Sequence, residues 1–102
     1  MTTASQEGVT LFTTVCDFDG GTYVSQQLEA KDAVEAIQLW SKALQRDEFI
    51  PKQSIEIAKL FEKDARGEFP PVALAGLLDV WQSSVTIDDK HCTVTLIRCV
   101  NR

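Results

Sequence analysis

Two kinds of hydrophobic periodicity divide this chain into three blocks. Residues 9–30 and 80–100 alternate between apolar and polar side chains as β-strands do, while apolar positions in residues 33–66 recur every three or four residues, as in amphipathic helices. Turn-forming residues interrupt each strand block once. The pattern predicts two β-hairpins separated by two helices, in the order ββααββ.

The first predicted hairpin joins residues 9–16 to residues 22–30. Its turn is the sequence Asp17-Phe18-Asp19-Gly20-Gly21, which combines residues that favour turns. Period two divides the second strand into two faces. We expect the face that meets the core to carry Thr22, Val24, Gln26 and Leu28.

The helical block is predicted to contain two helices. Asp32 followed by Glu35 is typical of a capping box, so an amphipathic helix of about 14 residues should begin there, with Trp40 in the core. Because the residue before a proline avoids the helical region, Pro51 separates this helix from a second one, which should end at Arg66-Gly67.

The last block begins with a stiff connector, Phe69-Pro70-Pro71. The apolar run at residues 72–78 is expected to form a helical turn or two, interrupted by Gly76. Residues 80–87 and 92–100 then read as two strands around the turn Asp88-Asp89-Lys90-His91, which completes the second hairpin.

This element order predicts a two-layer α+β sandwich, in which a four-stranded antiparallel sheet carries the helices on one face. Residues 1–8 have no periodic apolar signal and are expected to be a flexible N-terminus, so a single domain should span residues 9–102. No repeat or linker divides that domain.

The same topology predicts a local acidic patch. If the first and last strands are antiparallel neighbours at the sheet centre, both hairpin turns lie at one end of the sheet. Four carboxylates distant in sequence would then share one rim: Asp17, Asp19, Asp88 and Asp89. Turns at opposite ends of the sheet would remove this patch.

Charge and cysteine content narrow the classes of partner and compartment. Ten Lys and Arg against 15 Asp and Glu give a net charge of -5, which repels a nucleic acid. No stretch reaches the roughly 18 apolar residues of a membrane span. Three irregularly spaced cysteines do not form a secreted disulfide framework, so a reducing, cytoplasmic location is expected.

The sequence offers no clear catalytic, cofactor or metal motif. A metal held by His91, Cys92 and Cys16 is disfavoured because neighbouring strand residues point to opposite faces. The segment at residues 17–21 lacks the later ligands of a calcium loop, and no nucleophile elbow or phosphate-binding loop occurs. We therefore expect a protein that is not an enzyme and needs no cofactor.

The sheet face that the helices leave uncovered is expected to be polar and uncharged. Its predicted polar positions are Thr13, Ser25, Gln27, Ser83, Thr93 and Thr95. Tyr23, Trp81 and Ile97 would stand among them. Such a face is a solvated surface, a recognition platform anchored by aromatic residues, or the contact with a second copy in a homodimer.

The hairpin sequence Gly20-Gly21-Thr22-Tyr23-Val24-Ser25-Gln26, the helix sequence at residues 33–40 (AVEAIQLW) and Val80-Trp81 resemble a group of short bacterial proteins of uncharacterised function. That resemblance covers most of the chain and implies the same topology. In size, charge and class the chain is also similar to immunity proteins, which neutralise toxins.

The leading functional hypothesis is a protein-interaction domain that binds a basic partner. The resemblance to immunity proteins implies an immunity-type inhibitor as its particular form. Its candidate contact residues are Asp17, Asp19, Asp88, Asp89, Tyr23 and Trp81. One alternative is a small-molecule-binding or catalytic domain with a cleft beside the acidic turns. Another is a structural homodimerisation domain.

Overall fold

The computed structural model describes residues 8–66 and 70–99, without the side chains of residues 24–26 and 64–66. Its elements, in chain order, are β1 (Thr10–Phe18), β2 (Gly21–Ala30), α1 (Ala33–Asp47), α2 (Ser54–Arg66), β3 (Val72–Ala73), β4 (Val80–Ile87) and β5 (Lys90–Cys99). The predicted N-terminal segment lies, apart from Gly8, outside the described residues, as do Phe69 and residue 100.

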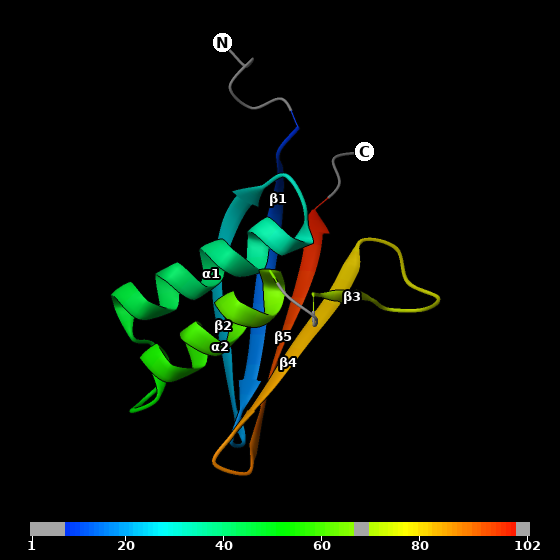
Figure 1. Cartoon of the computed structure of the whole chain (residues 1–102). Helices are drawn as coiled ribbons and strands as arrows, with labels where there is room; N and C mark the ends of the chain where they lie inside the picture. Colours follow the sequence, from blue (N-terminus) through cyan, green and yellow to red (C-terminus); the bar gives the residue numbers. More distant parts are fainter. Residues whose placement is uncertain (1–7, 67–69, 100–102) are drawn as a thin grey trace.

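In this part of the chain, five antiparallel strands form one sheet in the order β2-β1-β5-β4-β3, and both helices pack on the same face of it (Figure 1). The predicted α+β class, antiparallel sheet and one-sided helical layer are confirmed. The predicted strand count of four is wrong, because β3 adds a short fifth strand at the edge.

Strand β3 replaces the helical turn that was expected at residues 72–78. Val72 and Ala73 pair with Gln82 and Trp81, and the chain then forms a loop in which Gly76 has a positive φ of 82°. Pro70-Pro71 disfavours helix immediately before β3, and the φ of Gly76 is incompatible with helix after it. The apolar run is too short between these two breaks to form a helix.

Helix α1 begins as the capping-box pattern predicts. The Oδ1 atom of Asp32 accepts a hydrogen bond from the backbone N–H of Glu35 at 2.8 Å. The carboxylate of Glu35 reaches back one residue further than in the usual capping box, to the backbone N–H of Lys31, also at 2.8 Å. Helix α2 begins at Ser54, three residues after Pro51. The side-chain Oγ of Ser54 accepts a hydrogen bond from the backbone N–H of Ile50.

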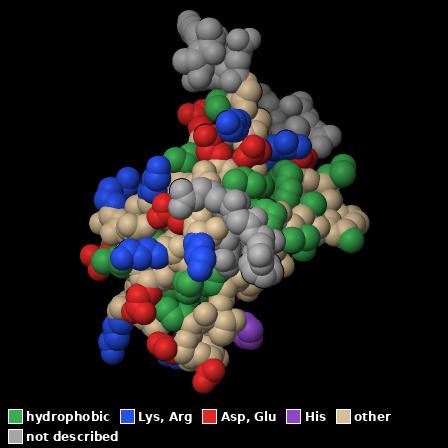
Figure 2. Space-filling model, in the orientation of Figure 1, with side chains coloured by type: hydrophobic (Ala, Val, Ile, Leu, Met, Phe, Trp, Pro, Cys, Tyr) green, Lys and Arg blue, Asp and Glu red, His purple; other side chains and the backbone are tan. Residues whose placement is uncertain are grey.

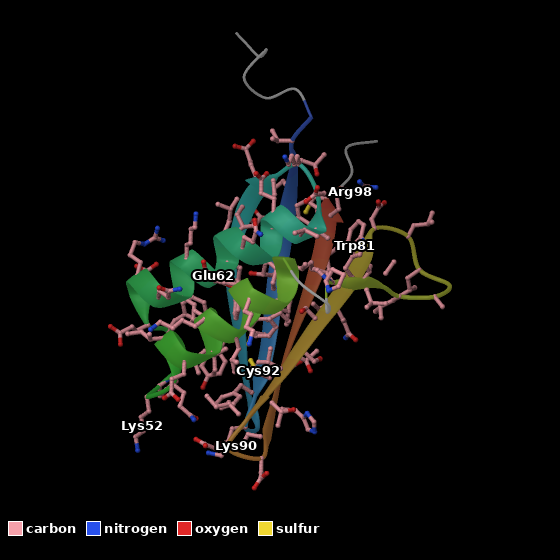
Figure 3. The ribbon with its side chains drawn as sticks, in the orientation of Figure 1. Lys52, Glu62, Trp81, Lys90, Cys92 and Arg98 are labelled. Atoms are coloured by element: carbon pink, nitrogen blue, oxygen red, sulfur yellow. The ribbon has the colours of Figure 1, made fainter. Side chains whose placement is uncertain are left out.

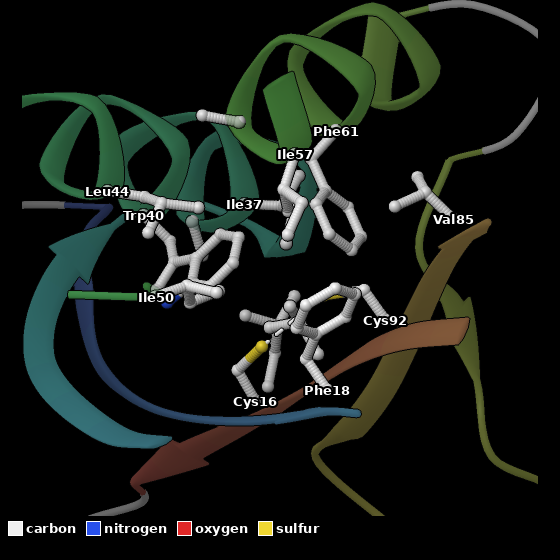
Figure 4. Close-up of a cluster of buried hydrophobic side chains, with 14 of the residues drawn as sticks. Cys16, Phe18, Ile37, Trp40, Leu44, Ile50, Ile57, Phe61, Val85 and Cys92 are labelled. Atoms are coloured by element: carbon white, nitrogen blue, oxygen red, sulfur yellow. Dashed lines mark hydrogen bonds between the residues drawn. The ribbon is translucent and has the colours of Figure 1, made fainter. Parts of the chain in front are cut away.

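The core lies between the helical layer and the covered face of the sheet (Figure 4). Trp40 is fully buried, as predicted, and its ring meets Phe61 edge-on with centroids 5.3 Å apart. The alternation of β1 places Phe12 and Cys16 on the covered face, where they are also fully buried. These contacts fix the helices to the central strands.

A register shift between Thr13 and Val15 changes which β2 residues face the helices. On one side of this irregularity Leu28 lies opposite Phe12, and on the other side Tyr23 lies opposite Cys16; both side chains pack against the core. Simple alternation would put Tyr23 and Leu28 on opposite faces. The predicted core face of β2 is therefore wrong beyond the shift: Thr22 lies opposite Asp17, on the uncovered face.

Candidate functional site

Both hairpin turns lie at the same end of the sheet (Figure 1). Strands β1 and β5 are antiparallel neighbours at its centre, with Phe18 opposite Cys92. The last residues of β1 and the first residues of β5 are therefore adjacent. The sequence-based hypothesis about the neighbouring strands and the shared end is confirmed.

Each hairpin is closed by a tight two-residue turn. The turn between β1 and β2 is Asp19-Gly20, with φ values of 49° and 80°, and the turn between β4 and β5 is Asp88-Asp89, with φ values of 50° and 63°. Two consecutive positive φ values are typical of type I′ turns, in which Asp and Gly are favoured. The turns are shorter than the predicted ones because β1 continues to Phe18 and β5 begins at Lys90.

We call Asp17, Asp19, Asp88 and Asp89 the acidic rim. Lys90 also lies at this end (Figure 3), and its Nζ is 3.3 Å from Oδ2 of Asp19. Four carboxylates and one ammonium give the five groups a formal charge of -3. The side chains of Lys90 and Asp19 are about half exposed, so water screens their attraction. The rim is acidic even with this ion pair formed.

The rim carboxylates do not form one flat patch. Asp17 lies on the uncovered face, opposite Thr93, and accepts a hydrogen bond from Thr22 Oγ1 at 2.8 Å. Asp88 instead accepts a hydrogen bond from Nε2 of Gln53, in the turn before α2, at 2.9 Å. The acidic rim therefore presents negative charge on both faces of the sheet at this end.

A shallow hollow of about 340 Å³ lies beside the first turn. It is lined by Asp17, Phe18, Asp19, Gly20, Gly21, Thr22, His91 and Thr93. Acidic side chains and the histidine lie near one another at this end of the molecule (Figure 2). The hollow can hold a small group, and its two carboxylates favour a cationic one.

His91, Thr22 and Thr93 were not among the predicted contact residues. His91 is exposed on the uncovered face, where its Nδ1 lies 3.2 Å from Thr86 Oγ1. The neighbouring Cys92 is buried on the opposite side of the sheet. A signal for His91 existed in the sequence, because the predicted pairing of the first and last strands already brings the start of β5 beside Asp19.

Cys16 and Cys92 lie in the core, with Sγ atoms 3.4 Å apart. The hydrogen bond between these thiols and their burial raise the pKa of Cys16 far above its ordinary range. A protonated, buried thiol is a poor nucleophile and a poor metal ligand. In the part of the chain that the structure describes, no group of three or more His, Cys, Asp and Glu side chains is arranged to hold a metal ion.

The structure does not bring Tyr23 and Trp81 onto the uncovered face. Tyr23 lies at the rim end but packs against the core on the helix side. Trp81 lies at the other end of the sheet (Figure 3), with its ring 5.8 Å from that of buried Phe12. Ser83 is also buried on the helix side, so the expected facing of β4 is reversed. Thr13, Gln27, Thr93, Thr95 and Ile97 do share the uncovered face.

The reversed assignment of β4 had a readable signal. Its alternate residues Trp81, Val85 and Ile87 are apolar, whereas Gln82, Ser84 and Thr86 are polar. Since period two groups these sets on opposite faces, the apolar set belongs against the helices. Ser83 shares that buried face, so the polarity of a single position was misleading.

The fold and rim define a small α+β domain with a two-helix layer, an uncovered sheet face and an acidic end. No protein-family model matches the chain, and neither the curated proteins nor the solved structures contain a match. No helix in the described residues is long and apolar enough to cross a membrane.

Proposed function

We propose that this chain is a non-enzymatic protein-interaction domain that binds a basic partner through its acidic rim. The observation that carries this proposal is the pairing of β1 with β5, which brings Asp17 and Asp19 beside Asp88 and Asp89. Opposite charge of this kind steers association and raises its rate at low salt. An immunity-type inhibitor of a basic toxin is the particular form of this function that we propose.

The hollow beside the first turn supports a specific binding mode. A Lys or Arg side chain of the partner would enter it between Asp17 and Asp19, while Asp88 and Asp89 contact the surrounding basic surface. Charged hydrogen bonds of Arg with carboxylates are the stronger option because they can be bidentate. Tyr23 and Trp81 have a structural role in this proposal, since both pack against the core.

The test is association with the purified products of the genes that neighbour this chain's gene, measured by stopped-flow mixing and calorimetry. Asp17→Asn with Asp19→Asn should slow association by about tenfold at low salt, and the difference should shrink at high salt. Asn tolerates the backbone conformation of the turn, so the fold should remain.

A matched control is the double variant Glu29→Gln with Glu56→Gln, which removes two exposed carboxylates outside the rim. It should associate nearly as fast as the wild type. Equal slowing by both double variants would show an effect of net charge alone and contradict the rim as the binding site. A neighbouring gene product that fails to bind would contradict the immunity-type function.

A small-molecule site in the same hollow is the alternative, favoured by its volume of about 340 Å³, which lies at the small end of ligand pockets. A small cation would shift the amide NMR signals of Thr22, His91 and Thr93 and leave Asp88 and Gln53 unaffected. A protein partner would shift both groups of signals.

A further inference from the structure

The segment at residues 70–78 forms an exposed apolar projection. Its sequence, PPVALAGLL, has no charged or polar side chain. Among the described residues, three of the five large hydrophobic side chains that are exposed lie here: Val72 at 65%, Leu77 at 56% and Leu78 at 83%. The loop after β3 projects beyond the sheet edge (Figure 1), and hydrophobic side chains gather around it in Figure 2.

This projection is continuous with the uncovered face of the sheet. Val72 lies opposite Gln82 on β4, and the next pair along β4 on the same face is Val80 with Ile97 of β5. Ile97 in turn lies opposite Thr13 of β1. We call the apolar patch the set Leu11, Val15, Val72, Leu77, Leu78, Val80 and Ile97, all of which are exposed or half-buried.

The loop is held in place at its base. Arg98 forms an ion pair with Asp79, and the backbone N–H of Arg98 donates to the carbonyl of Asp79 at 2.8 Å. The guanidinium also lies 5.4 Å from the centre of the Trp81 ring. Leu77 and Leu78 are therefore displayed on a loop that is anchored before any partner binds, which lowers the entropy lost on association.

We propose that the apolar patch is a self-association surface, on which a second copy of this chain docks around a two-fold axis. Each copy carries a charge of -5, but the acidic rim lies at the other end of the sheet. The nearest charges at the base of the loop, Asp79 and Arg98, neutralise one another. Glu29, an exposed carboxylate of β2, lies opposite Leu11 at the side of the patch away from the loop, so a contact centred on Val72, Val80 and Ile97 keeps the carboxylates of the two copies apart.

The patch combines a projecting loop with a flat strand surface. A two-fold contact places the same surface on both sides, so the loop of one copy can rest on the strands of the other. The loop carrying Leu77 and Leu78 is the projection, and the strands carrying Val80 and Ile97 are the flat area. Each loop would lie against the flat area of the other copy.

The geometry favours contact through the face rather than through the edge of the sheet. Strand β3 has two residues and follows Pro70-Pro71, which lack backbone donors, so it is a poor template for pairing with another strand. The flat part of the apolar patch spans four strands and three rows of side chains. At ordinary strand spacing this corresponds to an area of roughly 400 Å². A stable interface needs roughly 800 Å² from each partner, so the loop must contribute to it.

Sedimentation velocity over a series of concentrations tests this proposal. The wild type should shift from one chain to two as concentration rises. Leu78→Asp should raise the dimer dissociation constant by about 30-fold or more, because it places a charge in the centre of the contact. Leu78 is 83% exposed, so this change should leave the fold intact, which circular dichroism checks.

Ile55→Asp is the matched control, because Ile55 is 44% exposed on α2, outside the patch. It should dimerise like the wild type.

Alkylation of Cys99, which is exposed opposite Leu11, should be slower in the dimer than in Leu78→Asp. A wild type that stays monomeric at its highest soluble concentration overturns the proposal, as does equal dissociation by both variants. Binding of the monomer to neutral lipid vesicles through Leu78 would overturn it in favour of a lipid. These outcomes are independent of the acidic rim.

Discussion

The Sγ atoms of Cys16 and Cys92 lie 3.4 Å apart across the two central strands, and both side chains are fully buried. Cys16 lies opposite Val94, two residues from Cys92, so the thiols meet diagonally. Cys99 lies seven residues from Cys92 on the same strand and is exposed on the other face of the sheet. One strand therefore holds two thiols in different chemical environments.

The first prediction concerns thiol reactivity. In dilute native protein, Ellman's reagent should modify Cys99 quickly, and Cys16 and Cys92 should react only as fast as the core opens. In denaturant all three should react at once. Cys99→Ser should remove the fast phase. A fast phase of more than one thiol in native protein would contradict the burial of the pair.

The second prediction concerns stability at alkaline pH. Since the pKa of Cys16 is raised in the folded chain, the folded state keeps the proton that the unfolded state releases. This contribution to stability is complete below the unfolded pKa and is lost as pH rises above about 9. The free energy of unfolding should then fall by about 1.4 kcal/mol per pH unit for this thiol.

Urea unfolding between neutral and alkaline pH measures that slope. Cys16→Ala should make the fall of the unfolding free energy with pH less steep, by the equivalent of about one proton. The variant is less stable overall because it leaves a cavity. Cys99→Ala is the control, since it removes an exposed thiol from the same sheet, and the difference between the slopes of the two variants isolates the buried thiol. An unchanged slope in Cys16→Ala would show that other groups cause the alkaline loss.

The third prediction concerns the ion pair at the base of the projecting loop. The side chain of Asp79 is only 16% exposed, so Arg98→Met should leave a largely buried carboxylate without its cation. We expect a loss of about 1–3 kcal/mol in the free energy of unfolding, partly restored by adding Asp79→Asn. The more exposed pair of Arg46 and Asp47 is the control, and Arg46→Met should lower the free energy of unfolding much less than Arg98→Met does, because water screens the exposed pair. Equal losses would contradict a special role for Arg98.

The fourth prediction concerns the turn between β4 and β5. Asp88 and Asp89 both have positive φ, a conformation that Asn-Gly adopts with less strain. Asp88→Asn with Asp89→Gly should raise the free energy of unfolding by about 0.5–1 kcal/mol, as thermal denaturation would show. Asp89→Val should lower it, because a β-branched residue opposes positive φ. A stabilising Asp89→Val would exclude the type I′ geometry.

Local patterns were sufficient for most of the secondary structure. The step of three and four residues and the pair Asp32 and Glu35 predicted α1, and alternation predicted both hairpins, since these signals act between near neighbours in the chain. The apolar run at residues 72–78 was misassigned because pairing with β4, a contact that its own sequence does not encode, determines its conformation.

The candidate site depended on contacts over longer distances. The sequence contained the four rim carboxylates, and topology rules predicted their common end. It did not contain the hollow beside His91, nor the register shift in β1 and β2 that turns Tyr23 toward the core. One irregularity of this kind exchanges the two faces of a strand, and its cost or benefit depends on packing against the helices.

By itself, the sequence determined the α+β class, the helical pair, the buried Trp40 and the excess of negative charge, because periodicity, capping and composition act locally or add up over the whole chain. Tertiary structure alone decided the register shift that turns Tyr23 toward the core, the contact between Cys16 and Cys92, and the exposure of Leu77 and Leu78. These properties depend on which strands pair and in what register, and pairing energies arise between residues far apart in the chain.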